Sequence, residues 1–576
     1  MRFHVLACDF DETLVRRGRM ADATLTALER LSRIGVRLVM VTGRRLDDLL
    51  EIFEHPRLFD LIVAENGAVL YDPGRRATEN LAAPPPERLL ERLRAEGVTP
   101  LAAGRVIVAT EEPHDTKVLG AIRDLGLELQ VSYNKGAVMV LPAGVTKASG
   151  LAAALKRLKV SPHNVVAVGD AENDHAFLSS AGCGAAVANA LPALKDTADL
   201  RLAGKDGEGV VELAEMMIAG DLDALEIPRG YVLLGRREDG SEVRLPPYGT
   251  GAIVAGPSGS GKSTATTALL ERLVECGHQC VVIDPEGDYS EFPGVTVLGD
   301  ADRAPGVEEV LRLLESPDHS AVVNLIGMPL RDRPGFFTEV LPRIAALRAR
   351  LGHPHWVVVD EAHHLMPADL PEIAVKQARD IGSLLMVTVH PEAVSPAALR
   401  LADTLIAVGD DSEATVAAFA QARGTREPSP ASSGTGDLVV WRIGEDRTER
   451  VELVPGRAER TRHRRKYAAG TMSEDDSFYF TGPEERLRLR ARNLHTFVEL
   501  AEGVDEDTWL HHLRGGDYSR WIRDSLGDDD LAGDVADVEG SRDADAAGSR
   551  QRVVSLIERS YTLPAEPASY TPDDDE

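Results

Sequence analysis

The stretch HVLACDFDETLV, residues 4–15, runs from apolar residues into two carboxylates, Asp9 and Asp11. A short apolar run that ends in polar residues is typical of a strand buried in a parallel sheet. Alternation along such a strand places Asp9 and Asp11 on the same side of the chain, while Phe10 points away. One carboxylate can then attack phosphorus while the other moves protons, so the stretch predicts phosphate chemistry at a strand end.

Around this stretch, further apolar runs alternate with helical patterns. The runs VRLVMVT, LIVAENG and VVAVGD each end in polar or glycine residues. The pattern predicts an α/β domain over 1–222, a Rossmann-like parallel sheet wrapped by helices, with its site at the carboxyl ends of the strands. Between about 73 and 142 the pattern changes, and we expect a small α+β cap over the site.

Polar residues at the other strand ends complete a candidate phosphate site. Thr42 and Gly43 lie in VMVTGR, and Lys147 lies in GVTKASGL. Thr13 supplies a second hydroxyl. Asp170 ends the run VVAVGD, and carboxylates are the hard oxygen ligands that Mg²⁺ prefers. We predict phosphate binding by Thr42, Gly43 and Lys147, and metal binding by Asp9, Asp11, Asp170 and Asp174.

These four elements, in this order, resemble the haloacid dehalogenase superfamily over nearly all of 1–222. The sequence ENGA at 65–68 and the cap between the second and third elements look like its Cof-type, class IIB branch. The resemblance implies a Mg²⁺-dependent phosphatase. It also implies these roles: Asp9 as the nucleophile that forms an aspartyl-phosphate, Asp11 as general acid and base, Thr42 and Lys147 as phosphate holders, Asp170 as metal ligand and Asp174 as its support.

A second phosphate motif lies in the middle of the chain. GPSGSGKS, residues 256–263, follows the apolar AIVA and precedes the helical STATTALLERL, which is the strand, loop and helix order of a P-loop. Downstream, WVVVDEAHH supplies Asp360 for a Mg²⁺ shell, with Ser263, and Glu361 to orient a water. The predicted ATP-binding residues are Gly256, Pro257, Ser258, Gly259, Ser260, Gly261, Lys262, Ser263 and Thr264.

The region 228–455 resembles the HerA/FtsK branch of P-loop ATPases in VVIDPEGDY and DEAHH. The resemblance implies a ring of subunits and an arginine finger from a neighbouring subunit. The strand LLMVTVH carries Thr388 and His390 where that branch usually has a glutamine. Candidates for the arginine finger are Arg400, Arg423 and Arg442.

The rest of the chain is predicted to be a small helical domain over 466–526 and a mostly disordered acidic tail over 527–576. The basic segment GRAERTRHRRKY, residues 456–467, is interpreted as a solvated connector. Adjacent histidines lack a second ligand pair for a metal, so His363, His364, His511 and His512 are expected to be structural. Trp509, Tyr518 and Trp521 have helical spacing and are expected in a core.

Composition limits the partners. The formal net charge of −29 disfavours nucleic acid as a partner, although it does not exclude a local basic groove. The 4 cysteines are too scattered for a disulfide framework. No apolar run approaches a membrane span and no signal peptide is evident, so we expect a cytoplasmic protein without a membrane partner.

Together these features favour a bifunctional enzyme. Its expected ligands are a small phosphorylated metabolite, such as a sugar phosphate, together with ATP and Mg²⁺, and a homo-oligomeric ring is possible. One alternative is a HerA-like nucleic-acid motor or defence-type assembly with a nucleotide- or end-processing phosphatase domain. Another is a regulatory module that binds ATP without turnover, which Glu361 disfavours.

Overall fold

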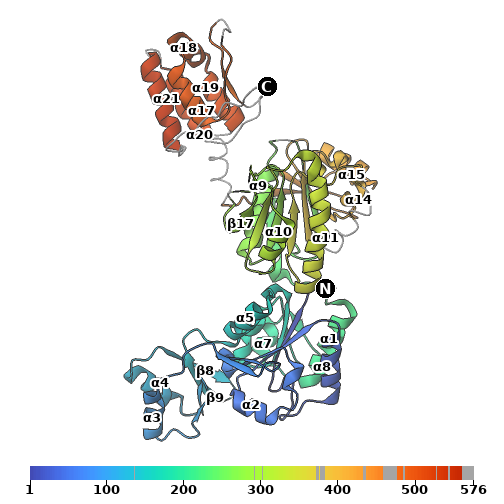
Figure 1. Cartoon of the computed structure of the whole chain (residues 1–576), viewed down its shortest axis with the longest axis vertical. Coiled ribbons are helices and arrows are strands. Elements are labelled where there is room, and N and C mark those ends of the chain that lie inside the picture. The colour runs from blue at the N-terminus through green and yellow to red at the C-terminus, as the bar shows by residue number, and fades with distance from the viewer. Residues whose placement is uncertain are drawn as a thin grey trace. The chain divides into compact units, whose positions relative to one another are not determined.

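The computed structural model divides into two compact units. The first comprises Met1–Ser290 and Gly294–Val454, and the second comprises Pro455–Glu576 with Glu291–Pro293. Figure 1 shows the chain coloured from its amino terminus to its carboxyl terminus. The structure describes residues 1–576 except 135, 258, 291, 301, 371–374, 376–382, 432–435, 458–476, 484–486, 527–528, 542–544 and 561–576.

The amino-terminal region contains the predicted sheet wrapped by helices. Its eight strands have the order β12-β11-β10-β1-β2-β3-β4-β5, and all neighbours from β12 to β3 are parallel. The strands are β1 Val5–Asp9, β2 Arg37–Val41, β3 Leu61–Ala64, β4 Val69–Asp72, β5 Ala77–Asn80, β10 Val165–Gly169, β11 Cys183–Ala186 and β12 Leu200–Arg201. The helices are α1 Asp22–Arg33, α2 Leu46–Ile52, α5 Lys147–Leu158, α6 His175–Ser180, α7 Pro192–Thr197 and α8 Asp206–Gly220.

The cap is a separate antiparallel sheet with the order β6-β7-β9-β8, covered by two helices. Figure 1 shows α3 and α4 beside β8 and β9 and apart from α1 and α8. The predicted cap boundary at 73 is wrong, because β5 lies beyond it and pairs antiparallel with β4, a strand of the core sheet. The cap elements are α3 Glu87–Ala95, β6 Ala102–Ala103, β7 Val108–Glu111, α4 Asp115–Asp124, β8 Leu129–Asn134 and β9 Ala137–Pro142.

The middle region is built on an eleven-stranded sheet with the order β14-β13-β23-β22-β21-β15-β20-β19-β16-β18-β17. Its strands β15 to β21 are parallel, while β13, β14, β22 and β23 form an antiparallel edge. The strands are β13 Val232–Arg236, β14 Glu242–Leu245, β15 Gly251–Ala255, β16 Cys280–Asp284, β17 Val295–Leu298, β18 Ser320–Asn324, β19 Trp356–Val359, β20 Ser383–Thr388, β21 Thr404–Val408, β22 Leu438–Arg442 and β23 Glu449–Leu453. The helices are α9 Lys262–Glu275, α10 Val307–Leu314, α11 Arg333–Leu351, α12 Ala362–Leu365, α14 Pro396–Leu399 and α15 Ser412–Arg423.

The second unit has its own apolar core, in which Trp509, Tyr518 and Trp521 are buried as expected. The prediction of a disordered tail from 527 is wrong for two segments that form helices. Leu531, Val535 and other apolar residues of these helices pack into the same core, which stabilises them despite the many aspartates. The elements are β24 Phe478–Phe480, β25 Leu489–Ala491, α17 Leu494–Gly503, α18 Glu506–Gly515, α19 Asp517–Trp521, α20 Asp529–Glu539 and α21 Ala546–Ser560. The basic residues 458–467 and the last residues 561–576 lie outside the described part of the chain.

Within the first unit, the segment before β10 contacts the middle region. His163 Nε2 lies 2.8 Å from the carbonyl oxygen of Cys276, the residue that follows α9. Asn164 donates to the carbonyl oxygen of Gly352 at 3.2 Å, just after α11. We call His163, His278, His353 and His355 the junction histidines, and their rings lie in mutual contact. No helix among the described residues is long and apolar enough to cross a membrane.

Candidate functional site

The ends of β1 and β10 bring three buried carboxylates together. Oxygen atoms of Asp9, Asp170 and Asp174 all lie within 4.8 Å of one another, as expected for ligands of one metal ion. Lys147, at the first turn of α5, donates to Asp9 Oδ1 and to Asp174 Oδ1, each at 2.6 Å. All four side chains are almost completely buried. The structure therefore assembles residues that are up to 165 positions apart in the sequence.

The turn after β10 explains how Asp174 reaches this cluster. Its Oδ2 accepts hydrogen bonds from the backbone N–H groups of Asp170 and Ala171, each at 2.9 Å. A Cβ atom at Gly169 would lie 2.6 Å from that same oxygen, so only glycine fits there. Thr13 donates to Asp170 Oδ1 at 3.2 Å, which fixes the second carboxylate from the β1 side.

The charge of the cluster favours a bound cation. Three carboxylates face one ammonium group. Burial, together with the neighbouring Asp174 and Asp170 carboxylates, raises the pKa of Asp9 to about 8, although Lys147 opposes this shift. Burial alone would lower the pKa of Lys147, but the Asp174 and Asp9 carboxylates raise it. A divalent ion such as Mg²⁺ fits this donor set, because it prefers carboxylate oxygens and would offset the excess negative charge.

Asp11 has a different neighbour. Its carboxylate accepts two hydrogen bonds from Arg44, at 2.8 Å from Nε and 2.7 Å from Nη2, and it is not part of the three-carboxylate cluster. Thr42 is fully buried, and its Oγ1 accepts from the backbone N–H of Arg44 at 3.1 Å. The sequence interpretation missed Arg44, although it directly follows the Thr42-Gly43 pair that marks the phosphate site.

Two amide side chains lie beside Gly43: Asn134 at the end of β8 in the cap, and Asn173 in the core turn after β10. The sequence interpretation missed Asn134. A Cβ atom built at Gly43 would lie 3.6 Å from Asn173 Nδ2, 3.7 Å from the Met139 sulfur and 3.9 Å from Asn134 Nδ2. Buried side-chain oxygens of Asn134 and Asn173 have no hydrogen-bond partner among the described residues. They are therefore available to a ligand that enters between cap and core.

The phosphate loop occupies the turn from β15 into α9, as predicted. Gly259 and Gly261 have positive φ angles of 78° and 97°, which glycine adopts without strain. Lys262 is buried and donates to the carbonyl oxygen of Pro257 at 2.7 Å. Burial lowers its pKa, an effect that the Glu361 and Asp360 carboxylates oppose. Ser258 lies outside the described residues.

The carboxylates expected beside this loop follow β19. Asp360 is buried, and burial together with the neighbouring Asp284 and Glu361 carboxylates raises its pKa well above the usual range. Burial likewise raises the pKa of Glu361, with Glu286 adding to the effect. The backbone of Glu361 has φ 42° and ψ 53°, the left-handed region that non-glycine residues adopt at a cost and that clusters at functional sites.

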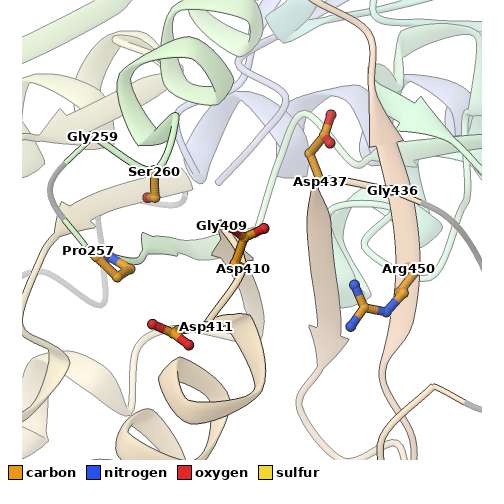
Figure 2. Close-up of a pocket in the computed structure, with 9 residues that line it drawn as sticks. All are labelled: Pro257, Gly259, Ser260, Gly409, Asp410, Asp411, Gly436, Asp437 and Arg450. Atoms are coloured by element: carbon orange, nitrogen blue, oxygen red, sulfur yellow. The ribbon is translucent and has the colours of Figure 1, made fainter. Parts of the chain in front are cut away.

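A cavity of about 550 Å³ adjoins the phosphate loop. Figure 2 shows Pro257, Gly259 and Ser260 on one side of it, with Asp437 and Arg450 from the antiparallel edge on the other. Asp410 and Asp411, which follow β21, also line it, together with Gly409 and Gly436. The three arginine-finger candidates have partners in this chain: Arg423 donates to the carbonyl oxygens of Leu399 and Ala402, Arg442 pairs with Glu449, and Arg400 is also engaged.

The expectation that the paired histidines are structural fits His512, which accepts from the backbone N–H of Thr481 and pairs with Asp517. His363 differs from this expectation. Its Nδ1 lies 3.3 Å from Glu361 Oε2, beside the predicted water-orienting carboxylate.

Two regions of the chain match models of known protein families. Residues 6–93 and 101–213 match the model of haloacid dehalogenase-like hydrolases, and residues 248–392 match that of an AAA domain. Phosphoglycolate phosphatase of Methanothermobacter thermautotrophicus is 30% identical over 220 residues, which cover 36% of this chain and 95% of that protein. The 5-amino-6-(5-phospho-D-ribitylamino)uracil phosphatase of Bacillus subtilis is 27% identical over 219 residues, covering 34% of this chain and 88% of that protein.

A solved haloacid dehalogenase-like hydrolase from Bacteroides thetaiotaomicron is 20% identical, with 37% of this chain and 99% of that chain covered at a TM-score of 0.33. The matched relatives correspond to the amino-terminal region, which carries the three-carboxylate cluster. The AAA match includes the phosphate loop and Glu361. Through its amino-terminal region the chain belongs to the haloacid dehalogenase-like hydrolases, and an AAA domain with a P-loop follows in the same chain.

Proposed function

We propose that the amino-terminal region is a Mg²⁺-dependent phosphomonoesterase that works through an aspartyl-phosphate. The observation that carries this proposal is the buried group of Asp9, Asp170 and Asp174 around Lys147. Mg²⁺, held by the three carboxylates, would supply positive charge next to the phosphoryl group. Lys147 and Thr42 would hold the phosphate oxygens.

The residues of this chain account for both halves of the reaction. An oxygen of Asp9 attacks phosphorus, the bond from phosphorus to the alcohol oxygen breaks, and Asp11 donates a proton to the leaving alcohol. Asp11 then takes a proton from water, the water oxygen bonds to phosphorus, and the bond to Asp9 breaks to release phosphate. Arg44 orients Asp11 for both proton transfers.

The substrate that we propose is a sugar phosphate or another small phosphorylated metabolite. The amide groups of Asn134 and Asn173 above Gly43 support this choice, because amides hydrogen-bond the hydroxyl or carboxyl groups of such molecules. The relatives named above act on phosphoglycolate in one case and on a ribityl phosphate in the other. Both chemical classes therefore belong in a substrate screen.

We further propose that the middle region binds and hydrolyses ATP. The phosphate loop would hold the phosphates, with Lys262 on the β and γ oxygens and Ser263 and Asp360 near Mg²⁺. Glu361 would take a proton from the water that attacks the γ-phosphorus while the β–γ bridging bond breaks. The cavity beside the loop would take the nucleoside. HerA-like nucleic-acid translocation is not favoured, because the chain carries a net charge of −29.

A series of contacts links the phosphate loop to the three-carboxylate cluster, and it supports coupling between the ATP site and the phosphatase site. Helix α9 begins at Lys262, and the residue after its last turn, Cys276, accepts from His163. His163 lies just before β10, which leads to Asp170. We therefore propose that nucleotide binding changes phosphatase kinetics, that ATP favours a homo-oligomeric ring, and that the protein works in the cytoplasm, where its 4 free cysteines would stay reduced.

One experiment with two readouts tests these proposals. Wild type, Asp9→Asn and Lys262→Ala are each assayed with phosphorylated sugars, glycolate and nucleotides, with and without ATP and Mg²⁺. We expect Asp9→Asn to lose phosphatase turnover and keep ATP hydrolysis, and Lys262→Ala to do the reverse and to lose any effect of ATP on the phosphatase. Full phosphatase activity in a folded Asp9→Asn protein would contradict the first proposal, and unchanged ATP hydrolysis in Lys262→Ala would contradict the second.

A further inference from the structure

His363 lies between the carboxylate of Glu361 and β20, the strand beside the phosphate-loop strand. Its Nδ1 lies 3.3 Å from Glu361 Oε2 and 3.2 Å from Thr388 Oγ1. Thr388 is fully buried at the end of β20, and it lies opposite Ala255, the last residue of β15. The imidazole nitrogen thus lies at hydrogen-bond distance from the Thr388 hydroxyl and at ion-pair distance from Glu361 Oε2, a buried oxygen that has no hydrogen-bond partner among the described residues.

The hydrogen-bonding capacity of this group allows two arrangements. When Nδ1 carries a proton, it can donate to Glu361 Oε2. When Nδ1 is unprotonated, it can accept from the Thr388 hydroxyl, whose oxygen already accepts from the backbone N–H of His390 at 3.1 Å. Burial and the nearby His364 and His390 lower the pKa of His363 to about 4, so the ring is neutral at pH 7 and carries one proton.

Several charged groups around Glu361 act on its carboxylate in opposing directions. Glu286 and Asp288 repel its carboxylate, while Lys262 and His390 attract it. Its backbone is held in the left-handed region, which sets the direction in which the side chain leaves the chain. A hydrogen bond to Oε2 would fix the carboxylate against these competing charges and leave Oε1 to accept the proton of the attacking water.

We propose that His363 is a positioning residue for nucleotide hydrolysis, which holds the Glu361 carboxylate through Oε2 and links its orientation to Thr388. This inference rests on the proposed ATPase function of the middle region. It assigns no contact with the nucleotide to His363. It predicts that losing the imidazole impairs the hydrolytic step and leaves nucleotide binding intact.

The test compares four variants of the full chain: His363→Ala, His363→Asn, His364→Ala and Glu361→Gln. We expect His363→Ala to lower the turnover number for ATP by roughly 10²-fold, the scale seen when a reacting group is misplaced by about 1 Å, while ATP affinity stays unchanged. His363→Asn should recover much of that loss, because its amide can occupy the place of Nδ1. His364→Ala is the matched control, since its imidazole comes from the same short helix and has no described ion pair with Glu361, whereas His363 has one.

The outcomes separate this inference from the function on which it rests. Wild-type turnover in His363→Ala, with strong loss in Glu361→Gln, would overturn the positioning role and keep the ATPase. Equal loss in His363→Ala and His364→Ala, or weaker ATP binding that accounts for the whole loss, would also overturn it. If the wild type hydrolyses no nucleotide, both the inference and the proposed ATPase fail.

Discussion

At the scale of single residues, the phosphate chemistry depends on which charges meet. The positions of Asp9, Asp170 and Lys147 could be predicted, because each lies at a strand end or a first helical turn, and these ends meet at one edge of a parallel sheet. The side chain that hydrogen-bonds to Asp11 could not be predicted. Arg44 reaches it only because the loop after β2 folds back toward β1, and no periodic pattern encodes that direction.

Arg44 offers a test at this scale. Its two hydrogen bonds hold the Asp11 carboxylate in one orientation, and proton transfer by a positioned group contributes ~10²- to 10⁴-fold to a rate. We expect Arg44→Ala to reduce phosphatase turnover within that range, and Arg44→Lys to restore it only in part, because an ammonium group lacks the planar fork. Arg45→Ala is the control, since Arg45 pairs with Asp48. Equal rates in Arg44→Ala and wild type would show that Asp11 needs no such partner.

At the scale of elements, the core strands followed from the sequence more closely than the cap and the tail. Apolar runs identified β1, β2, β3 and β10, whereas β5 was assigned to the cap, because strand pairing across a hairpin leaves little trace in composition. Helix α20 was missed because its aspartates suggested disorder, but the spacing of Leu531, Val535 and Val538 gives an apolar face that is buried in the structure.

Glu65 joins the core to the cap and supplies a test at this scale. Its carboxylate accepts from the backbone N–H groups of Arg105, Val106 and Ile107 at 2.9, 2.7 and 2.9 Å. Glu65→Ala leaves these donors without that partner, and each unsatisfied buried group costs about 1–3 kcal/mol. We expect faster amide hydrogen exchange and faster proteolysis at 104–107, together with a higher KM.

Glu65→Gln keeps one acceptor oxygen and should have an intermediate effect. Glu111→Ala, at an exposed carboxylate of the cap, is the control for surface charge. Exchange at 104–107 that is the same in wild type and Glu65→Ala would show that this contact does not hold the cap segment.

At the scale of the whole molecule, the first unit joins its two sites through the junction histidines. These contacts could not be predicted, since His163 and Cys276 are 113 positions apart and no motif links them. Burial lowers the pKa of His163, His353 and His278, the last to about 2, and that of His355 lies well below the usual range. Arg2 and Arg348 lie close enough to add to this effect.

These lowered pKa values determine the direction in which the stability of the folded protein changes with pH. A histidine whose pKa is lower in the folded protein binds fewer protons than in the unfolded chain, so stability is lost as pH falls below about 6.5. For His278 this amounts to about 2 kcal/mol between pH 6.5 and 5. His278→Phe keeps a ring in place, and it should lose less stability than wild type over that interval, measured by denaturant unfolding at both pH values.

The carboxyl groups of Asp9 and Asp284, whose pKa values are raised to about 8 and about 6, work in the opposite direction in both proteins and cancel in the difference. His55→Phe, at an exposed position away from the junction, should behave as wild type. The same pH dependence in His278→Phe and wild type would mean that His278 is not a buried neutral group.

Phosphorylation of Asp9 during turnover can be measured directly. The full-length protein is mixed with Mg²⁺ and a reactive phosphomonoester and quenched in acid within one turnover, and its peptides are analysed by mass spectrometry. We expect a phosphoryl group on Asp9, more of it in Asp11→Asn because water is then activated poorly, and none in Asp9→Asn. A phosphoryl group on another residue, or sustained turnover with no phosphorylated Asp9, would contradict this expectation.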